Sequence, residues 1–328
     1  MSTRRDDHGS GRRRGVPIVV VCLALTLSAA LTGCSVRRMA VDSLASTLAD
    51  GGASVFASDD DPELVGQALP FALKTFEALL QSDPSHRGLL LATCSGYTQY
   101  TFGFVEIEAE RLKFDDYRQS RRARDRALKL YLRGRDYCLR ALDLEAPGAS
   151  ERLVREPETA LSDLGKDHVP LLYWTAGAWG SAISAGRDRP EVVADLASVR
   201  ALLGRALELD ADWNDGALHD AMVVLESLPE AMGGSLERAR EHHQRALELN
   251  DGRRAGTHVT WAWQVSVPRQ DRAGFEEALD RALAVDVDRL PEERLANTIY
   301  QDLARLLQDQ ADDLFLDLDT FDSEGTPQ

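Results

Sequence analysis

The spacing of apolar positions along the chain is that of a row of amphipathic helices. From residue 61 onwards apolar residues recur every three or four positions, and valines stand inside stretches rich in Leu, Ala and Arg rather than in alternating runs. The pattern predicts helices at 61–80, 87–113, 116–145, 170–186, 190–209, 213–228, 235–249, 254–266, 271–285 and 291–310. The connections are short, which favours antiparallel neighbours. The predicted fold class is therefore all-α.

A six-residue phrase recurs at the predicted helix ends. It reads RALDLE at 140–145, RALELD at 205–210, RALELN at 245–250 and RALAVD at 281–286. Its last three copies are 40 and 36 residues apart, close to the period of about 34 residues in tetratricopeptide repeats. The first helices of these pairs lack the Trp, Leu, Gly and Tyr order of such repeats. We therefore expect a degenerate tetratricopeptide-like array of antiparallel helix pairs, an α-solenoid.

Helix starts carry their own signals. Asp61 is a suitable N-cap before Pro62 at the first helical position, and Ser235 is a suitable N-cap after two glycines.

The first 33 residues have the pattern of a lipoprotein signal peptide. Five arginines precede an apolar run at 16–30, and LTGC at 31–34 places Cys34 where a diacylglycerol is attached. An uncleaved short anchor is the alternative. Lipid attachment at Cys34 predicts a location in the cell envelope facing the periplasm, and Ser35 favours the outer membrane. The remaining chain divides into a tether with a first short helix at 34–56, a helical domain at 57–311 and an acidic tail at 312–328.

The net charge of the chain limits the classes of molecule that it can bind. The net charge is −16, and removal of residues 1–33, which hold five Arg and two Asp, leaves −19. Such a chain repels nucleic acid and anionic lipid heads, so acyl chains rather than basic residues would hold it at the membrane.

No catalytic or cofactor motif is present. The sequence has no GxSxG elbow, HExxH or phosphate-binding glycine loop, so we expect neither an enzyme nor a cofactor. Adjacent His242 and His243 diverge by about 100° on a helix, and with His219 they form no metal ligand set. His243 is expected to be a packed repeat residue.

Five stretches resemble the TatT component family of lipoproteins associated with TRAP transporters. They are ASDDDPELVGQALPFALKTFEALLQSDPSHRGLLLATCSGYTQYTFGFVEIEAERL (57–112), RARDRALKLYLRGRDYCLRAL (122–142), LLYWTAGAWGSAIS (171–184), GGSLERAREHHQRALEL (233–249) and RLANTIYQDLARLLQDQADDLF (294–315). The resemblance implies a helical periplasmic protein that can form homotrimers. It also implies that the protein partners the extracytoplasmic solute-binding protein of a TRAP transporter, with a tunnel that relays ligand. The competing hypothesis is a scaffold lipoprotein for envelope assembly with no tunnel.

Aromatic residues are the candidates for the lining of that tunnel, and ordinary core packing is the alternative for each of them. Three share one helix face at i, i+3 and i+7, three stand among glycines and alanines, and two follow later. The candidates are Tyr97, Tyr100, Phe104, Tyr173, Trp174, Trp179, Trp261 and Trp263.

Two further sets of residues each have two interpretations. Arg118, Arg122 and Arg126 form an i, i+4, i+8 row, named the basic row below, that would bind an anionic ligand or partner; otherwise it is a solvated face paired with Glu106, Glu108 and Glu110. Cys94 and Cys138 would either form a disulfide in an oxidising compartment or stand as two small apolar helix residues, since the family carries small residues there.

Overall fold

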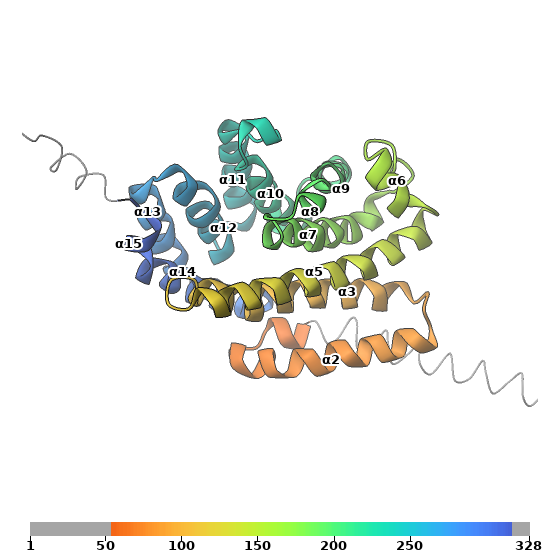
Figure 1. Ribbon diagram of the computed structural model, residues 1–328, viewed down its shortest axis with the longest axis horizontal. Coiled ribbons are helices and arrows are strands. Elements are labelled where there is room, and N and C mark those ends of the chain that lie inside the picture. The colour runs from red at the N-terminus through yellow and green to blue at the C-terminus, as the bar shows by residue number, and fades with distance from the viewer. Residues whose placement is uncertain (1–53, 317–328) are drawn as a thin grey trace, which may run out of the picture.

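The computed structural model describes residues 54–316, and every regular element in that range is a helix (Figure 1). The longer α-helices are α2 (Pro62–Ser82), α3 (Arg87–Thr101), α5 (Tyr117–Glu145), α7 (Val169–Ala185), α9 (Leu196–Asp210), α10 (Trp213–Glu226), α11 (Leu236–Asn250), α13 (Arg272–Leu283) and α14 (Arg294–Asp309). The shorter ones are α4 (Ile107–Arg111), α6 (Ala149–Arg155), α8 (Pro190–Val193), α12 (Ala255–Thr260) and α15 (Ala311–Leu314). The prediction of an all-α fold is confirmed.

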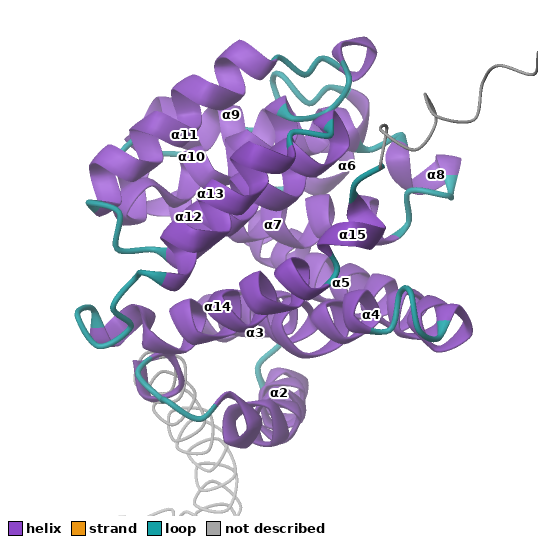
Figure 2. Cartoon of the chain, turned by 90° about the vertical axis from the view of Figure 1, so that its left-hand side faces the viewer, coloured by secondary structure: helices purple, strands orange, loops and turns teal. Residues whose placement is uncertain are grey.

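Helices pack in pairs along the chain. The helix α3 packs on α5, α5 on α7 and α7 on α9, while α10 pairs with α11 and α12 with α13. Figure 1 shows the long α5 running across the molecule beside α3, with α2 on the outside of that layer. The helix α14 contacts α2, and the view turned by 90° shows α14 above α2 (Figure 2). The C-terminal helices therefore close against the N-terminal ones.

The N-cap residues predicted from the sequence do cap their helices. The Asp61 side chain accepts a hydrogen bond from Leu64 N at 3.0 Å, and the Ser235 hydroxyl accepts one from Arg238 N at 3.3 Å. The recurring phrase does end helices: its copies finish α5 at Glu145, α9 at Asp210 and α11 at Asn250. The alanines of the phrase are buried, because the partner helix packs closely against them. The phrase is part of the scaffold.

The structure also departs from the predicted helices. The segment expected at 190–209 is two helices, α8 and α9, and the short α6 was not expected. The segments expected at 87–113 and 254–266 each contain a π-helical stretch, η1 (Phe102–Glu106) and η4 (Trp261–Ser266), where the hydrogen bonds widen from i→i+4 to i→i+5. Amphipathic periodicity does not reveal a single inserted residue, so these breaks were missed.

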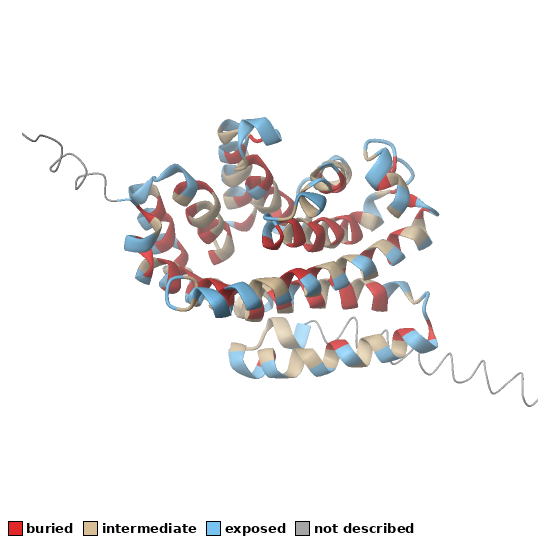
Figure 3. Ribbon diagram, in the orientation of Figure 1, coloured by how far each residue is buried: buried red, intermediate tan, exposed pale blue. Residues whose placement is uncertain are grey.

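A disulfide between Cys94 and Cys138 joins the middle of α3 to α5, with the two Cα atoms 5.4 Å apart. Both cysteines are fully buried in the largest apolar cluster, which extends from α3 and α5 through α7 to α9. A second apolar cluster is built from α12, α13, α14 and α15. The burial pattern in Figure 3 shows the inner helices buried and α2 mostly half-buried or exposed.

The packed body reaches slightly beyond the expected start of the tail at 312. Helix α15 continues to Leu314, and the Phe315 ring packs against Phe275 with centroids 5.0 Å apart. The signal peptide at 1–33, Cys34 and most of the tether, to residue 53, lie outside the described residues, as does the tail from 317. Among residues 54–316 no helix combines the length and apolarity needed to cross a membrane.

Candidate functional site

Polar and aromatic side chains from seven helical segments meet in the interior. We name this set the interior polar cluster; its members come from η1, α5, α7, α10, α12 with its N-cap residue, the 3-10 helix η6 (Pro291–Glu293) and α14. They are Glu106, Tyr131, Tyr173, Asp220, Arg254, Thr257, Glu293 and Tyr300.

Asp220 is the central acid of the cluster. Its Oδ2 accepts a hydrogen bond from the Thr257 hydroxyl at 2.9 Å, while its Oδ1 is buried without a partner. Burial raises the pKa of the Asp220 carboxyl to about 7, and the Thr257 hydrogen bond and Arg254 oppose that shift only in part. The carboxyl is therefore close to half-protonated at neutral pH.

Tyr173 and Tyr300 flank this acid. Burial raises the pKa of Tyr173 to about 12, and it raises the pKa of Tyr300 as well, with the charge of Asp220 acting in the same direction on both. Within residues 54–316 neither hydroxyl has a hydrogen-bond partner, and neither oxygen is fully buried. Both side chains are only half-buried.

Both ends of the cluster are held by charged groups. At one end the Tyr131 hydroxyl donates to the Glu106 carboxylate. At the other, the buried Arg254 guanidinium pairs with Glu293 and donates to Asn214 O at 2.7 Å. The carbonyl of Asn214 is presented by a rare backbone turn, in which Asn214, Asp215 and Gly216 all have positive φ.

The two π-helical stretches supply groups to this region. The first, η1, carries Phe102, whose ring meets Tyr300 with centroids 5.2 Å apart, and Glu106 four residues later. The second, η4, begins at Trp261, which stacks on His243 at 4.6 Å. Insertions of this kind are frequent at functional sites because they turn side chains that a regular helix would point elsewhere.

The tunnel candidates fall into four groups. Tyr173 belongs to the interior polar cluster and contacts Trp174 and Trp213, with ring centroids 5.1 and 4.9 Å away. Trp261 and Trp263 pack half-buried at the edge of the second apolar cluster. Trp179 is 2 % exposed, and its indole N–H donates to Asp195 at 3.1 Å. Trp179 is a core residue, as the packing alternative expects.

Tyr97, Tyr100 and Phe104 do share one face of the α3–η1 segment, but that face points away from the cluster. The Tyr97 hydroxyl donates to Glu77 of α2 at 2.8 Å, and the Tyr97 ring stacks on Tyr137 of α5. Phe104 lies against Gly66 of α2, where a Cβ would be 2.7 Å from the ring. These residues fill the seam between α2 and α5, so they do not join Tyr173.

The basic row is exposed on α5. Arg126 donates to the Tyr100 hydroxyl at 3.2 Å, and all three arginines are exposed. The expected pairing with glutamates is wrong: Glu108 pairs with Arg111, Glu110 with Lys113, and Glu106 turns inwards to Tyr131. The turn between α4 and α5 separates the two sets, at the break that the sequence predicts between residues 113 and 116.

Four histidines lie at the joint between α10, α11 and α12. His219 Nδ1 and His242 Nδ1 are 2.8 Å apart, and burial lowers the pKa values of His243 and His258 to about 4. Across residues 54–316, no three His, Cys, Asp or Glu side chains are grouped closely enough to hold a metal ion. His243 is half-buried and stacks on Trp261.

Asp220, Tyr300 and Phe102 were not among the sequence candidates. One sequence feature is related to Tyr300, the small residue Gly256 at the start of α12. A Cβ at this position would lie 2.7 Å from the Tyr300 ring, so a glycine leaves room for the ring. For Asp220 we find no signal in the sequence, because one acid in a chain with 54 acidic residues does not stand out.

The raised pKa of Asp220 predicts how stability depends on pH. Folding favours the protonated carboxyl, so its stabilising effect is complete below about pH 4 and is lost as pH rises towards 7. Asp220→Asn keeps an acceptor for Thr257 and stays neutral. Relative to wild type, the variant should therefore gain up to about 1.4 kcal/mol in free energy of unfolding per pH unit between pH 5 and 7.

Urea unfolding of the full-length protein at pH 5, 6 and 7 measures this difference. Asp60→Asn, which neutralises an exposed aspartate, is the control for a simple loss of charge. Parallel pH profiles for Asp220→Asn and wild type would contradict the assignment.

Comparison with known proteins agrees with this architecture. Residues 58–315 match the family described as TRAP transporter T-component (TAtT). A protein of Treponema pallidum (strain Nichols), described as uncharacterized, is 35% identical over 322 residues, covering 91% of this chain and 98% of that protein. The match spans every described helix from α2 to α15. The chain belongs to the TRAP transporter T-component family.

Proposed function

We propose that this protein is a lipid-anchored accessory component of a TRAP-type uptake system that docks the solute-binding subunit and relays its ligand. Membership of the family supports association with TRAP transport components. In this proposal Cys34 carries the lipid anchor and the helical body faces the periplasm, attached to the outer membrane. The homotrimer implied by the resemblance stays a prediction.

The observation that supports a relay of ligand through the protein is the interior polar cluster. Tyr173 and Tyr300 present hydroxyls without partners among the described residues, and aromatic rings from Trp174, Trp213 and Phe102 surround them. A pure scaffold would gain nothing from leaving such groups unpaired, because unpaired interior hydroxyls cost stability. The arrangement favours a ligand path over the competing function of an envelope scaffold without one.

The basic row supports docking. Arg118 and Arg122 are exposed on α5 and form no ion pair in the described part of the chain, although the whole chain carries −16. Positive side chains on an otherwise acidic surface attract a complementary acidic patch and help to orient the partner. We therefore place the contact with the solute-binding subunit on this part of α5.

Association of the full-length protein, purified in detergent, with the solute-binding subunit of the same TRAP system tests the proposal. We expect a complex at tens of micromolar. Arg118→Glu with Arg122→Glu should weaken it roughly three- to tenfold, with the loss shrinking at high salt. Arg155→Glu on α6 changes an equally exposed charge and should leave affinity unchanged.

Two outcomes would count against the proposal. Failure to associate at these concentrations contradicts docking. Mass spectrometry of small molecules extracted from the complex tests the relay, because a complex that retains none would leave a scaffold as the better function.

A further inference from the structure

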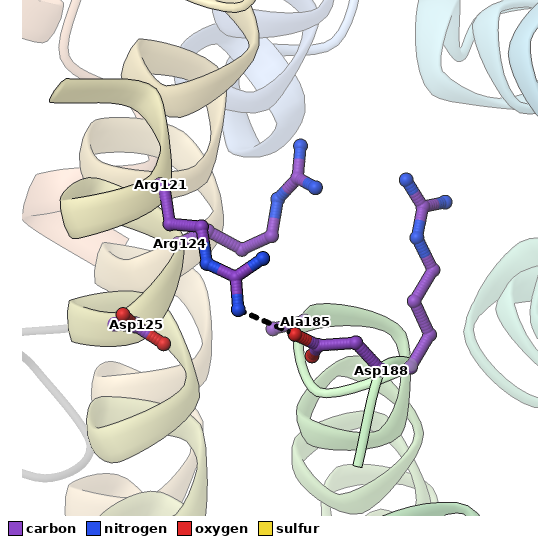
Figure 4. A pocket seen from close by; sticks show the side chains of 6 residues that line it. Arg121, Arg124, Asp125, Ala185 and Asp188 are labelled. Atoms are coloured by element: carbon purple, nitrogen blue, oxygen red, sulfur yellow. Dashed lines mark hydrogen bonds and ion pairs between the residues drawn. The ribbon is translucent and has the colours of Figure 1, made fainter. Parts of the chain in front are cut away.

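A small cavity opens on the surface beside the Glu106 end of the interior polar cluster. It has a volume of about 190 Å³ and lies between α5 and the turn that follows α7. Figure 4 shows Arg121 reaching from α5 to Asp188 on that turn, with the Arg124 side chain extending from α5 beside it. The lining consists of Arg121, Arg124, Asp125, Ala185, Arg187 and Asp188. We name it the arginine pocket.

The acids of the arginine pocket are already neutralised. Asp188 pairs with Arg121 at 2.6 Å, and Asp125 pairs with Arg189 at 2.5 Å. Arg124 and Arg187 remain, and within residues 54–316 neither forms an ion pair or a hydrogen bond. Two guanidinium groups thus line one cavity with ten N–H donors between them and no acceptor.

Helix electrostatics explain only one of these two arginines. The pocket adjoins the C-terminal end of α7, where the helix dipole favours a cation such as Arg187. Arg124 comes from α5 and adds a second positive charge to the same cavity. Two like charges in one cavity repel each other, and a bound anion would relieve that repulsion.

The nearest further acid lies behind the pocket. Burial raises the pKa of the Glu106 carboxyl, while the Tyr131 hydrogen bond and the charges of Arg124 and Arg187 lower it. The charges of both guanidinium groups therefore act on Glu106. Its carboxylate accepts a hydrogen bond from the Tyr131 hydroxyl and forms no ion pair with either arginine. The donors of Arg124 and Arg187 stay available at the cavity.

We propose that the arginine pocket binds an oxyanion group, a carboxylate or a phosphate, between Arg124 and Arg187. Planar guanidinium forks match the paired oxygens of these groups. The cavity is smaller than the roughly 300–1,000 Å³ typical of pockets for drug-sized molecules, so it holds a small anion or the anionic end of a longer solute. The role of the pocket as an entrance that selects anionic ligands for the path behind Glu106 rests on the proposed function.

Isothermal titration of the full-length protein with succinate and, separately, with inorganic phosphate tests this site. Both titrations are run at constant ionic strength, so that general screening is the same. Wild type should bind at least one of the two anions. Arg124→Gln and Arg187→Gln should each weaken that binding roughly tenfold or more, because each removes charge-assisted hydrogen bonds.

Matched variants separate the pocket from overall charge. Lys129→Gln removes an exposed positive charge from the same helix and should leave anion binding unchanged. Arg124→Lys keeps the charge but loses the fork, and should bind more weakly than wild type and more tightly than Arg124→Gln. Thermal unfolding midpoints confirm that each variant is folded at the titration temperature.

The outcomes are decisive in both directions. Preference for succinate identifies a carboxylate site, and preference for phosphate identifies a phosphate site. No binding of either anion by folded wild type, or binding that Arg124→Gln and Arg187→Gln leave intact, overturns the proposal. Anion binding by a protein that does not associate with the solute-binding subunit would contradict the proposed function alone.

Discussion

Replacing Cys94 and Cys138 together by alanine is expected to lower the free energy of unfolding by about 4 kcal/mol. The disulfide closes a loop with a sequence separation of 44 residues, and a cross-link of that span restricts the unfolded chain by about this amount in the chain-entropy treatment. In the folded protein the bond joins α3 to α5 inside the main apolar cluster. Urea unfolding of the full-length double variant and the oxidised wild type gives the difference.

Reductant supplies an internal control. Both cysteines are fully buried, so dithiothreitol should reach the bond only when the chain unfolds. Unfolding under reducing conditions should bring wild type down to the stability of the double variant, which itself should not respond. Equal midpoints for the double variant and the oxidised wild type would show that the cross-link does not stabilise the fold.

Trp179→Ala is expected to cost about 3–5 kcal/mol of stability, the range for removing a large buried aromatic side chain. The Trp179 ring is enclosed by the main apolar cluster, and Arg135 lies over it at 5.2 Å from the centroid. The change would also leave Asp195 without the indole donor. Chemical unfolding of the variant at neutral pH measures the loss.

Trp174→Ala is the matched comparison on the same helix. Trp174 is half-buried beside Tyr173, so its loss should cost less than half as much as that of Trp179. Equal losses for the two variants would contradict the assignment of Trp179 to the core and of Trp174 to a half-buried position beside Tyr173.

The helices were predictable because each signal for them is local. The Asp61 and Ser235 caps, and the alanines that close RALELD and RALELN, act within one or two turns of the chain. The π-helical stretches were not predictable, because one extra residue barely changes the spacing of apolar positions along the sequence. The split at 190–209 was missed for the same reason: the apolar spacing continues through the break between α8 and α9.

The site was predictable only where a residue's own neighbours are unusual. Tyr173 stood out because small residues follow it in α7. The shared face of Tyr97, Tyr100 and Phe104 was also evident, but not which helices would cover it, and α2 and α5 do so. Asp220 and Tyr300 lie 80 positions apart and meet only through packing of α10 against α12 and of α12 against α14. Contacts of that range leave no mark on local sequence.

The η1 stretch also affects how relatives should be aligned. A chain with one residue fewer between positions 102 and 106 would form an ordinary α-helix there, and every later side chain of the segment would turn by about 100°. Glu106 would then leave Tyr131, and both the interior hydroxyls and the arginine pocket would lose their shared acid. A single-residue gap at this position, which an alignment would treat as trivial, would separate chains that keep this interior from chains that have lost it.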